Sequence, residues 1–149
     1  MRVGEYCNRE VVFVEQESSL VEAAQLMRKY HVGDLVVVDE HHGRRHPIGI
    51  LTDRDIVIKL VAEGLALDSV TVGDVMSFEL QVAREQDDLY ETLQRMRVRG
   101  IRRMPVIDAE GVLIGLLTFD DLLELISEQL SQVVELVDNE QHNEQILRH

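Results

Sequence analysis

The sequence predicts an α+β fold in which two β-α-β-β-α units pack with pseudo-twofold symmetry, followed by an extended C-terminal helix. The first observation behind this prediction is an internal repeat. Val3-Gly4-Glu5 aligns with Val72-Gly73-Asp74, and the same offset holds without a gap as far as Asp39 and Asp108. The second observation is that strand and helix patterns follow one another in the same order in both copies. The predicted repeats span residues 3–66 and 67–128, and residues 129–149 are a helical extension with a polar tail.

Each element of the first copy has a local signal. A β-branched and aromatic run predicts a strand, and two serines offer caps for a helix whose apolar residues recur at helical spacing. A continuous apolar run then indicates a strand that is covered on both faces. The predicted elements are a strand at 11–14, a helix over 20–30, a strand at 35–38, a polar loop at 41–47, a strand at 48–51 and a helix from Thr52 to near Gly64.

The second copy repeats this order, with strands at 80–83, 104–107 and 112–117, a turn at 109–111, and helices over 89–98 and from Thr118. The last helix continues beyond one repeat unit, because apolar residues persist at helical spacing. Such a stripe needs a partner, and we expect a second subunit there, with packing on the same module as the alternative. Residues 139–149 are polar and are expected to fray. The stripe consists of Leu122, Ile126, Leu130, Val133, Val134 and Val137.

Composition limits the classes of function. The chain has 28 acidic and 15 basic residues, a formal net charge of −13, which argues against general nucleic-acid binding. Its 45% hydrophobic residues are enough for a core. No apolar stretch approaches the length of a membrane span, and the N-terminus lacks the order of a secretory signal. A single cysteine, Cys7, allows no internal disulfide. We therefore expect a cytoplasmic protein.

Both copies carry Gly-apolar-Leu-Thr-x-x-Asp where a strand runs into a helix. The motif places Thr52 and Asp55 in the first copy and Thr118 and Asp121 in the second. Helix N-termini present unpaired N–H groups to anions, a hydroxyl suits phosphate or ribose oxygens, and a carboxylate suits paired ribose hydroxyls. The same pattern is also a helix capping box, so both interpretations stay open. Because small repeats are marginal alone, we expect the copies to pack together and leave two clefts between them.

A pair of arginines distinguishes the two predicted clefts. Arg102 and Arg103 precede the 104–107 strand, whereas the first copy has Gly33-Asp34 at the same positions. Guanidinium groups suit bidentate phosphate contacts, so we expect one cleft to bind a nucleotide phosphate better. Three further arginines, Arg95, Arg97 and Arg99, are expected on a solvated helix face.

The pattern resembles a known family. Two β-α-β-β-α copies, each preceded by Val-Gly-Glu/Asp and ending in Gly-apolar-Leu-Thr-x-x-Asp, look like the paired cystathionine β-synthase (CBS) domains of a Bateman module. Arg-Met-Pro-Val-Ile-Asp in the second copy and Thr-Asp-Arg-Asp in the first strengthen the likeness, which covers residues 3–128. The sequence departs from the family pattern at Val36, where proline is common, and at Gly33-Asp34.

This resemblance implies a stand-alone regulatory protein that binds AMP, ADP, ATP or S-adenosylmethionine between its repeats, pairs into a homodimer and modulates an unknown partner protein. It implies that the threonines and aspartates of both motifs contact phosphate or ribose, with Arg54, Arg102 and Arg103 as basic contacts. Apolar residues around the first strand and the Pro-Val strand are implied to enclose the adenine. These are Val12, Ile101, Met104 and Pro105.

Three other functions compete with this one. An enzyme is disfavoured, because the two repeats fill the chain and no nucleophile, base and orienting acid stand together. A metal site among His41, His42 and His46 is disfavoured by the adjacent Arg44 and Arg45. A ligand-free dimeric adaptor acting through its acidic surface and C-terminal helix remains the alternative, because capping alone would explain both Thr-x-x-Asp motifs.

Overall fold

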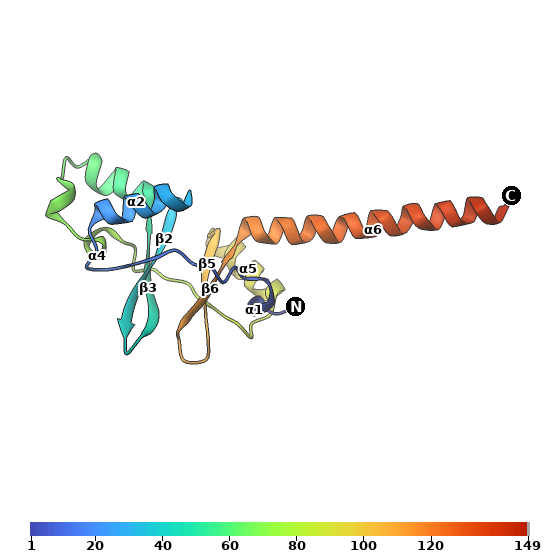
Figure 1. Cartoon of the computed structure of the whole chain (residues 1–149), viewed down its shortest axis with the longest axis horizontal. Coiled ribbons are helices and arrows are strands. Elements are labelled where there is room, and N and C mark those ends of the chain that lie inside the picture. Colours follow the sequence, from blue (N-terminus) through green and yellow to red (C-terminus); the bar gives the residue numbers. More distant parts are fainter. Residues whose placement is uncertain (149) are drawn as a thin grey trace.

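The structure, a computed structural model, describes residues 1–148 and contains both predicted β-α-β-β-α units (Figure 1). Short helices α1 (Val3–Tyr6) and α4 (Val72–Val75) precede the two units, and a 3₁₀ turn (Leu67–Ser69) lies between them. The first unit consists of β1 (Phe13–Glu15), α2 (Leu20–Tyr30), β2 (Asp34–His41), β3 (Arg44–Thr52), and α3 (Asp53–Ile56) with a π-helical turn (Val57–Val61). The second consists of β4 (Ala83–Arg84), α5 (Leu89–Arg99), β5 (Arg103–Ile107), β6 (Leu113–Thr118) and α6 (Phe119–Arg148).

The two sheets have the same topology. In each, the first strand is parallel to the second, and the second is antiparallel to the third. The register shifts at equivalent places, between Val37 and Val38 in one sheet and between Val106 and Ile107 in the other. The repeat in the sequence is therefore reproduced down to the irregularities of the strands.

Helices α2 and α5 also begin and end alike. Ser19 Oγ accepts the N–H of Glu22 at 3.1 Å, and Asp88 Oδ2 accepts the N–H of Glu91 at 3.0 Å. Such caps satisfy N–H groups that have no partner inside the helix. At the other end the chain turns through left-handed residues, His31 in α2 and Gly100 in α5. Sequence-based bounds for these helices were correct to within one residue.

Each repeat gives its leading segment to the other repeat. The N–H of Val3 donates to Asp87 O at 2.9 Å, and the N–H of Val72 donates to Ser18 O at 3.0 Å. Val3 is accordingly buried in the core of the second unit, whereas Val72, Val75 and Met76 are buried in the core of the first. Figure 1 shows α1 beside α5 and α4 below α2. We call residues 3–8 the N-terminal arm and residues 72–77 the linker arm. Neither core is complete without this exchange of arms.

Three features differ from the sequence-based expectations. The polar loop expected at 41–47 is a hairpin, because β2 and β3 extend to a two-residue turn at His42-Gly43, both with positive φ. In place of the strand expected at 80–83, the structure has only the two-residue strand β4, Ala83–Arg84. The tail expected to fray is helical, since α6 continues to Arg148.

Helix α6 projects away from the two sheets along most of its length (Figure 1). Leu122 is buried in the second core and Leu125 is partly buried against it, but Leu123, Ile126, Leu130 and Val133 are exposed. Within residues 1–148, no helix has the length and apolar character needed to cross a membrane.

Candidate functional site

The first Thr-x-x-Asp motif forms a closed capping box at the start of α3. Thr52 Oγ1 accepts the N–H of Asp55 at 3.0 Å, and Asp55 Oδ2 accepts the N–H of Thr52 at 3.1 Å. Lys59 Nζ lies 3.6 Å from Asp55 Oδ1 and donates to Val75 O at 2.9 Å. The side chains of Thr52 and Asp55 therefore stabilise the N-terminus of α3 without any ligand. Arg54, next to them, is exposed.

The second motif is only half closed. Thr118 Oγ1 accepts the N–H of Asp121 at 3.1 Å and so caps α6. Asp121 lines a surface pocket of about 340 Å³ together with Glu5, Glu124 and Glu128. A carboxylate among three other acids is a poor neighbour for phosphate. The two motifs thus share the capping function, but their aspartates lie in different electrostatic surroundings.

The glycines of these motifs make room for the exchanged arms. A Cβ on Gly49 would lie 2.6 Å from Ser77 O, and a Cβ on Gly115 would lie 2.7 Å from Cys7 Sγ. Backbone pairing of Ile50 with Ser77 and of Leu116 with Asn8 explains this close approach. These two glycines therefore lie against atoms of the exchanged arms.

Arg103 pairs with the residue at its own position in the other repeat. Its Nη1 lies 2.8 Å from Asp34 Oδ1, and both side chains are mostly buried. Burial raises the pKa of the Asp34 carboxyl, and the nearby Arg103 guanidinium opposes that rise. Arg103 is therefore held in a contact between repeats and would have to exchange it for a phosphate.

Arg102 lies on the surface beside the start of α6. Its side chain is 76% exposed, 3.9 Å from Asp120 and over the ring of Phe119. The N–H of Phe119 donates to Arg102 O at 2.7 Å, and the equivalent bond joins Asp53 to Gly33 O at 2.9 Å. These bonds tie the start of each motif helix to the residue before the central strand. Arg102 is thus the freer of the two predicted phosphate contacts.

A pocket of about 660 Å³ opens beside the first repeat. It includes Val12, which was predicted to contact adenine. It also includes Tyr30 and Val32, which follow one another across the end of α2. Neither Thr52 nor Asp55 belongs to its lining. The full lining is Asn8, Glu10, Val11, Val12, Phe13, Leu26, Tyr30 and Val32.

Of the predicted apolar contacts in the second repeat, Met104 is fully buried in the core and Pro105 is also buried. Ile101 is partly buried against that core. The side chain of Met104 cannot contact an adenine ring in this arrangement, because it points from β5 into the core and is fully buried. Ile101, which aligns with Val32 of the first pocket, is the accessible member of this group.

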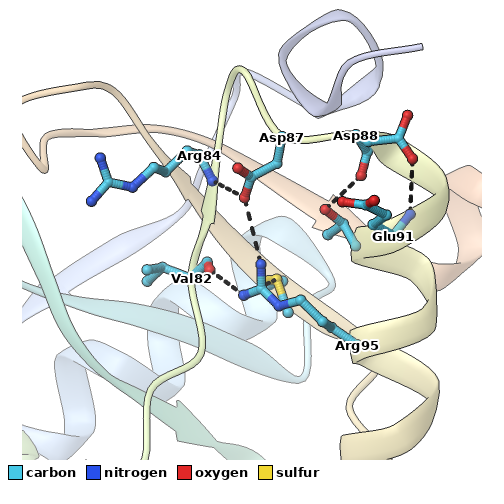
Figure 2. Close-up of polar contacts among 8 residues, drawn as sticks. Val82, Arg84, Asp87, Asp88, Glu91 and Arg95 are labelled. Atoms are coloured by element: carbon cyan, nitrogen blue, oxygen red, sulfur yellow. Dashed lines mark hydrogen bonds and ion pairs between the residues drawn. The ribbon is translucent and has the colours of Figure 1, made fainter.

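Arg95 of α5 occupies the position in the second repeat that is equivalent to Leu26 of α2 in the first. Figure 2 shows its guanidinium between Val82 and Asp87. Nη2 donates to Val82 O at 2.7 Å, and Nη1 lies 3.5 Å from Asp87 Oδ2. Asp87 Oδ2 in turn accepts the N–H of Arg84 at 2.9 Å. Sequence reasoning placed Arg95 on a solvated face; comparing α2 with α5 residue by residue would have revealed the replacement of a leucine by an arginine.

The three histidines of the predicted loop lie on the β2–β3 hairpin: His41 ends β2, His42 is in the turn and His46 is in β3. His41 Nε2 is 2.8 Å from Asp39 Oδ2, and His46 Nδ1 is 3.0 Å from Gly111 O on the other repeat. Arg44 of the hairpin pairs with Glu110. In the part of the chain that the structure describes, no cluster of three or more histidine, cysteine or acidic side chains is arranged to hold a metal ion. Burial raises the pKa of the Cys7 thiol.

The interlocked repeats and their junctions define the class of protein: a tandem α+β module with internal pseudo-twofold symmetry. The family model for the CBS domain matches residues 3–62 and 72–128. The chain belongs to the CBS-domain family, as a pair of such domains.

Its similarity to characterised and uncharacterised relatives agrees with this. Hypoxic response protein 1 of Mycobacterium tuberculosis is 35% identical over 121 residues, which cover 81% of this chain and 82% of that protein. A solved structure of Hypoxic Response Protein I with two coordinated zinc ions has a TM-score of 0.72 at 32% identity, and the likeness covers 83% of this chain and 98% of that one. An uncharacterised protein of Methanopyrus kandleri is 38% identical over 123 residues, 83% of this chain, and this chain spans 61% of its length.

A further solved structure carries ligands. The CBS domain pair of protein MJ0100, in complex with 5′-methylthioadenosine and S-adenosyl-L-methionine, has a TM-score of 0.71 at 25% identity. The likeness covers 87% of this chain and 98% of that one. That neighbour therefore binds two adenosine derivatives on the same fold.

Proposed function

We propose that this CBS domain pair is a non-catalytic sensor that binds an adenosine-containing ligand and through it regulates another protein. AMP, ADP, ATP, S-adenosylmethionine and methylthioadenosine are the candidate ligands. The observation that carries the proposal is the pocket beside the first repeat, whose apolar and aromatic lining matches a purine ring. The ligand-bound CBS pair of MJ0100 supports the same class of ligand.

The pocket has the size and chemistry for a nucleoside. Its volume of about 660 Å³ lies in the usual range of small-molecule sites. Val12 and Val32 offer apolar surface, and the half-exposed ring of Tyr30 offers an aromatic face on which a base can stack. Asn8 and Glu10 add polar groups that can bind the amino group of adenine or a ribose hydroxyl.

Regulation requires the ligand to favour one arrangement of the protein over another. The pocket supports such coupling, because Asn8 belongs both to its lining and to the exchanged arm. The N–H of Asn8 donates to Leu116 O, and the N–H of Leu116 donates back to Asn8 O, at 2.9 and 2.8 Å. A ligand that contacts Asn8 would therefore act directly on the junction between the repeats.

Thermal unfolding with each candidate ligand tests this proposal. A ligand at a hundred times its dissociation constant stabilises a fold by about 2.7 kcal/mol, on the order of 5 to 10 °C for a chain of this size. Tyr30→Ala should abolish the shift, whereas Tyr90→Ala, an exposed tyrosine on α5 outside the pocket, should retain it. If no candidate raises the wild-type midpoint, the ligand-free adaptor is the better account.

Self-association is the second part of the proposal. The exposed apolar residues Ile126, Leu130, Val133 and Val137 follow one another at alternating steps of four and three along α6. This is the spacing of a coiled-coil seam. The acids Glu124, Glu128, Glu135 and Asp138 stand off that seam, so like charges do not oppose pairing of two copies. A homodimer through α6 would cover the stripe.

A further inference from the structure

The two repeats differ chemically at two equivalent positions of α2 and α5. Leu26 of α2 lines the first pocket, and Arg95 stands at the same place on α5. Tyr30 of the first pocket is matched by Arg99 in the same way. We call the first pocket the first cleft, and the equivalent place in the second repeat, beside Arg95 and Arg99, the second cleft. Leucine and tyrosine suit an uncharged ring, whereas two arginines suit an anion.

Arg95 is held in place by contacts within its own repeat. Its guanidinium reaches from α5 to the chain just before β4, where Nη2 donates to Val82 O at 2.7 Å. The contact with Asp87 Oδ2 is longer, at 3.5 Å (Figure 2). Met104 Sδ lies 3.9 Å from Nη2. The short bond is made to a neutral carbonyl, and the one carboxylate partner is at the limit of hydrogen-bond distance.

We infer that Arg95 makes the second cleft selective for phosphorylated adenosine ligands, while the first cleft accepts uncharged ones. In the structure Arg95 bridges Val82 and Asp87 across the place of the second cleft. A ligand phosphate would displace both partners, because a charge-assisted bidentate contact is stronger than a bond to a neutral carbonyl. This inference rests on the proposed function and assigns a ligand class to each of its two clefts.

The bridge also sets the affinity of the second cleft. A phosphate binds only when Arg95 has left Val82 and Asp87, so the apparent affinity falls by the fraction of protein in which it has done so. Weakening the bridge without removing the arginine should therefore raise the affinity for a phosphorylated ligand. Asp87 permits such a change, because an asparagine there keeps an oxygen for the N–H of Arg84 but loses the negative charge.

Calorimetric titrations of AMP and adenosine into four proteins test the inference. Wild type should bind AMP more tightly than adenosine at one of two sites. In Arg95→Leu this preference should fall about tenfold to a hundredfold, the range for hydrogen bonds to charged groups, while adenosine binding is unchanged. Arg97→Leu, an equal change of charge at an exposed position of the same helix, should keep the preference. Asp87→Asn should bind AMP a few-fold more tightly.

The outcomes separate the two proposals. If neither AMP nor adenosine binds wild type, the proposed function fails and this inference fails with it. If AMP binds but its preference over adenosine is the same in Arg95→Leu as in wild type, the inference alone is wrong. A weaker AMP affinity in Asp87→Asn would likewise overturn the bridging role. Because Arg95 is 44% exposed, Arg95→Leu should fold normally, which far-ultraviolet circular dichroism would verify.

Discussion

Asp34 and Arg103 stand at the same position of the two repeats and bind each other across the junction, with 2.8 Å between Oδ1 and Nη1. Each begins the central strand of its sheet. A symmetric pair of identical residues would place two like charges or two neutral groups here. The two repeats therefore carry different residues at this position for a structural reason: the equivalent positions face each other, and opposite charges there form an ion pair.

We predict that the two partners of this pair contribute unequally to stability. Arg103→Leu leaves the mostly buried Asp34 carboxylate without its partner and should lower the free energy of unfolding at pH 7 by about 1 kcal/mol or more. Asp34→Asn removes the charge together with its desolvation cost and should be close to neutral. Urea unfolding of both variants measures the difference, and the exchanged double variant Asp34→Arg/Arg103→Asp should regain part of the loss.

The pH dependence of Arg103→Leu follows from the Asp34 pKa. Burial already raises the pKa of this carboxyl in the folded protein, and loss of the guanidinium raises it further. The folded state then holds a proton that the unfolded state has released, so stability falls as pH rises from the ordinary carboxyl pKa through the raised one. The deficit of Arg103→Leu relative to wild type should thus be larger at pH 7 than at pH 4. A deficit that grows on acidification would contradict this assignment.

Glycine at position 115 is predicted to be required for the fold rather than for a ligand. Gly115→Ala would bring a Cβ within 2.7 Å of Cys7 Sγ and 3.0 Å of Asn8 O, and the backbone atom cannot move aside cheaply. We expect a loss of about 2 kcal/mol, measured by thermal or urea unfolding without ligand. Gly43→Asn is the matched control, since the hairpin turn has open space and asparagine tolerates its positive φ. Equal midpoints for the two variants would disprove the arm contact.

The capping role of Thr52 can be measured apart from ligand binding. Thr52→Ala removes the acceptor for the N–H of Asp55 and should cost about 1 kcal/mol in the ligand-free protein. Thr52→Ser keeps the hydroxyl and should restore most of that stability. A Thr52→Ala protein as stable as wild type would show that the box contributes little, and the threonine would then be free for a ligand.

The seam of α6 predicts a change in oligomeric state. Leu130→Asp places a charge at the centre of the exposed stripe and should convert a homodimer into a monomer, observed by light scattering during size-exclusion chromatography. Ser131→Asp adds the same charge at the next residue, off the seam, and should remain dimeric. A wild-type protein that is monomeric at tens of micromolar would refute the seam.

Much of the fold follows from the sequence because its signals are local. Ser19 before an apolar 3.6 pattern marks the start of α2, and Gly100 marks the end of α5. The exchanged arms were missed because Val3 and Val72 carry no sign of which core they enter. Their burial depends on the packing of segments that are far apart in the sequence, as in the bonds of Val3 to Asp87 and of Val72 to Ser18.

The candidate site shows the same difference between local signals, which the sequence reveals, and contacts between distant residues, which it does not. The Thr-x-x-Asp motifs were recognised, but whether they cap or bind depends on their surroundings. Lys59 lies beside Asp55, whereas Asp121 lines a pocket together with Glu124. The pairing of Asp34 with Arg103 and the bridge made by Arg95 are both contacts of side chains across gaps in space. No spacing in the sequence encodes them, although unequal residues at equivalent repeat positions mark where to look.

The exchange of arms has a consequence for how the chain acquires its structure during synthesis. The first core cannot close until the segment containing Val72 and Met76 has left the ribosome, and Val3 must wait for β4, β5 and the start of α6. The earliest residues to be made are thus among the last to be placed, which gives long loop closures and slows folding. The same interlocking predicts that residues 1–128 unfold in a single cooperative transition and not in two separate ones. During refolding at high concentration, the arm of a second copy of the chain could occupy the place of the chain's own arm, which would give a domain-swapped dimer.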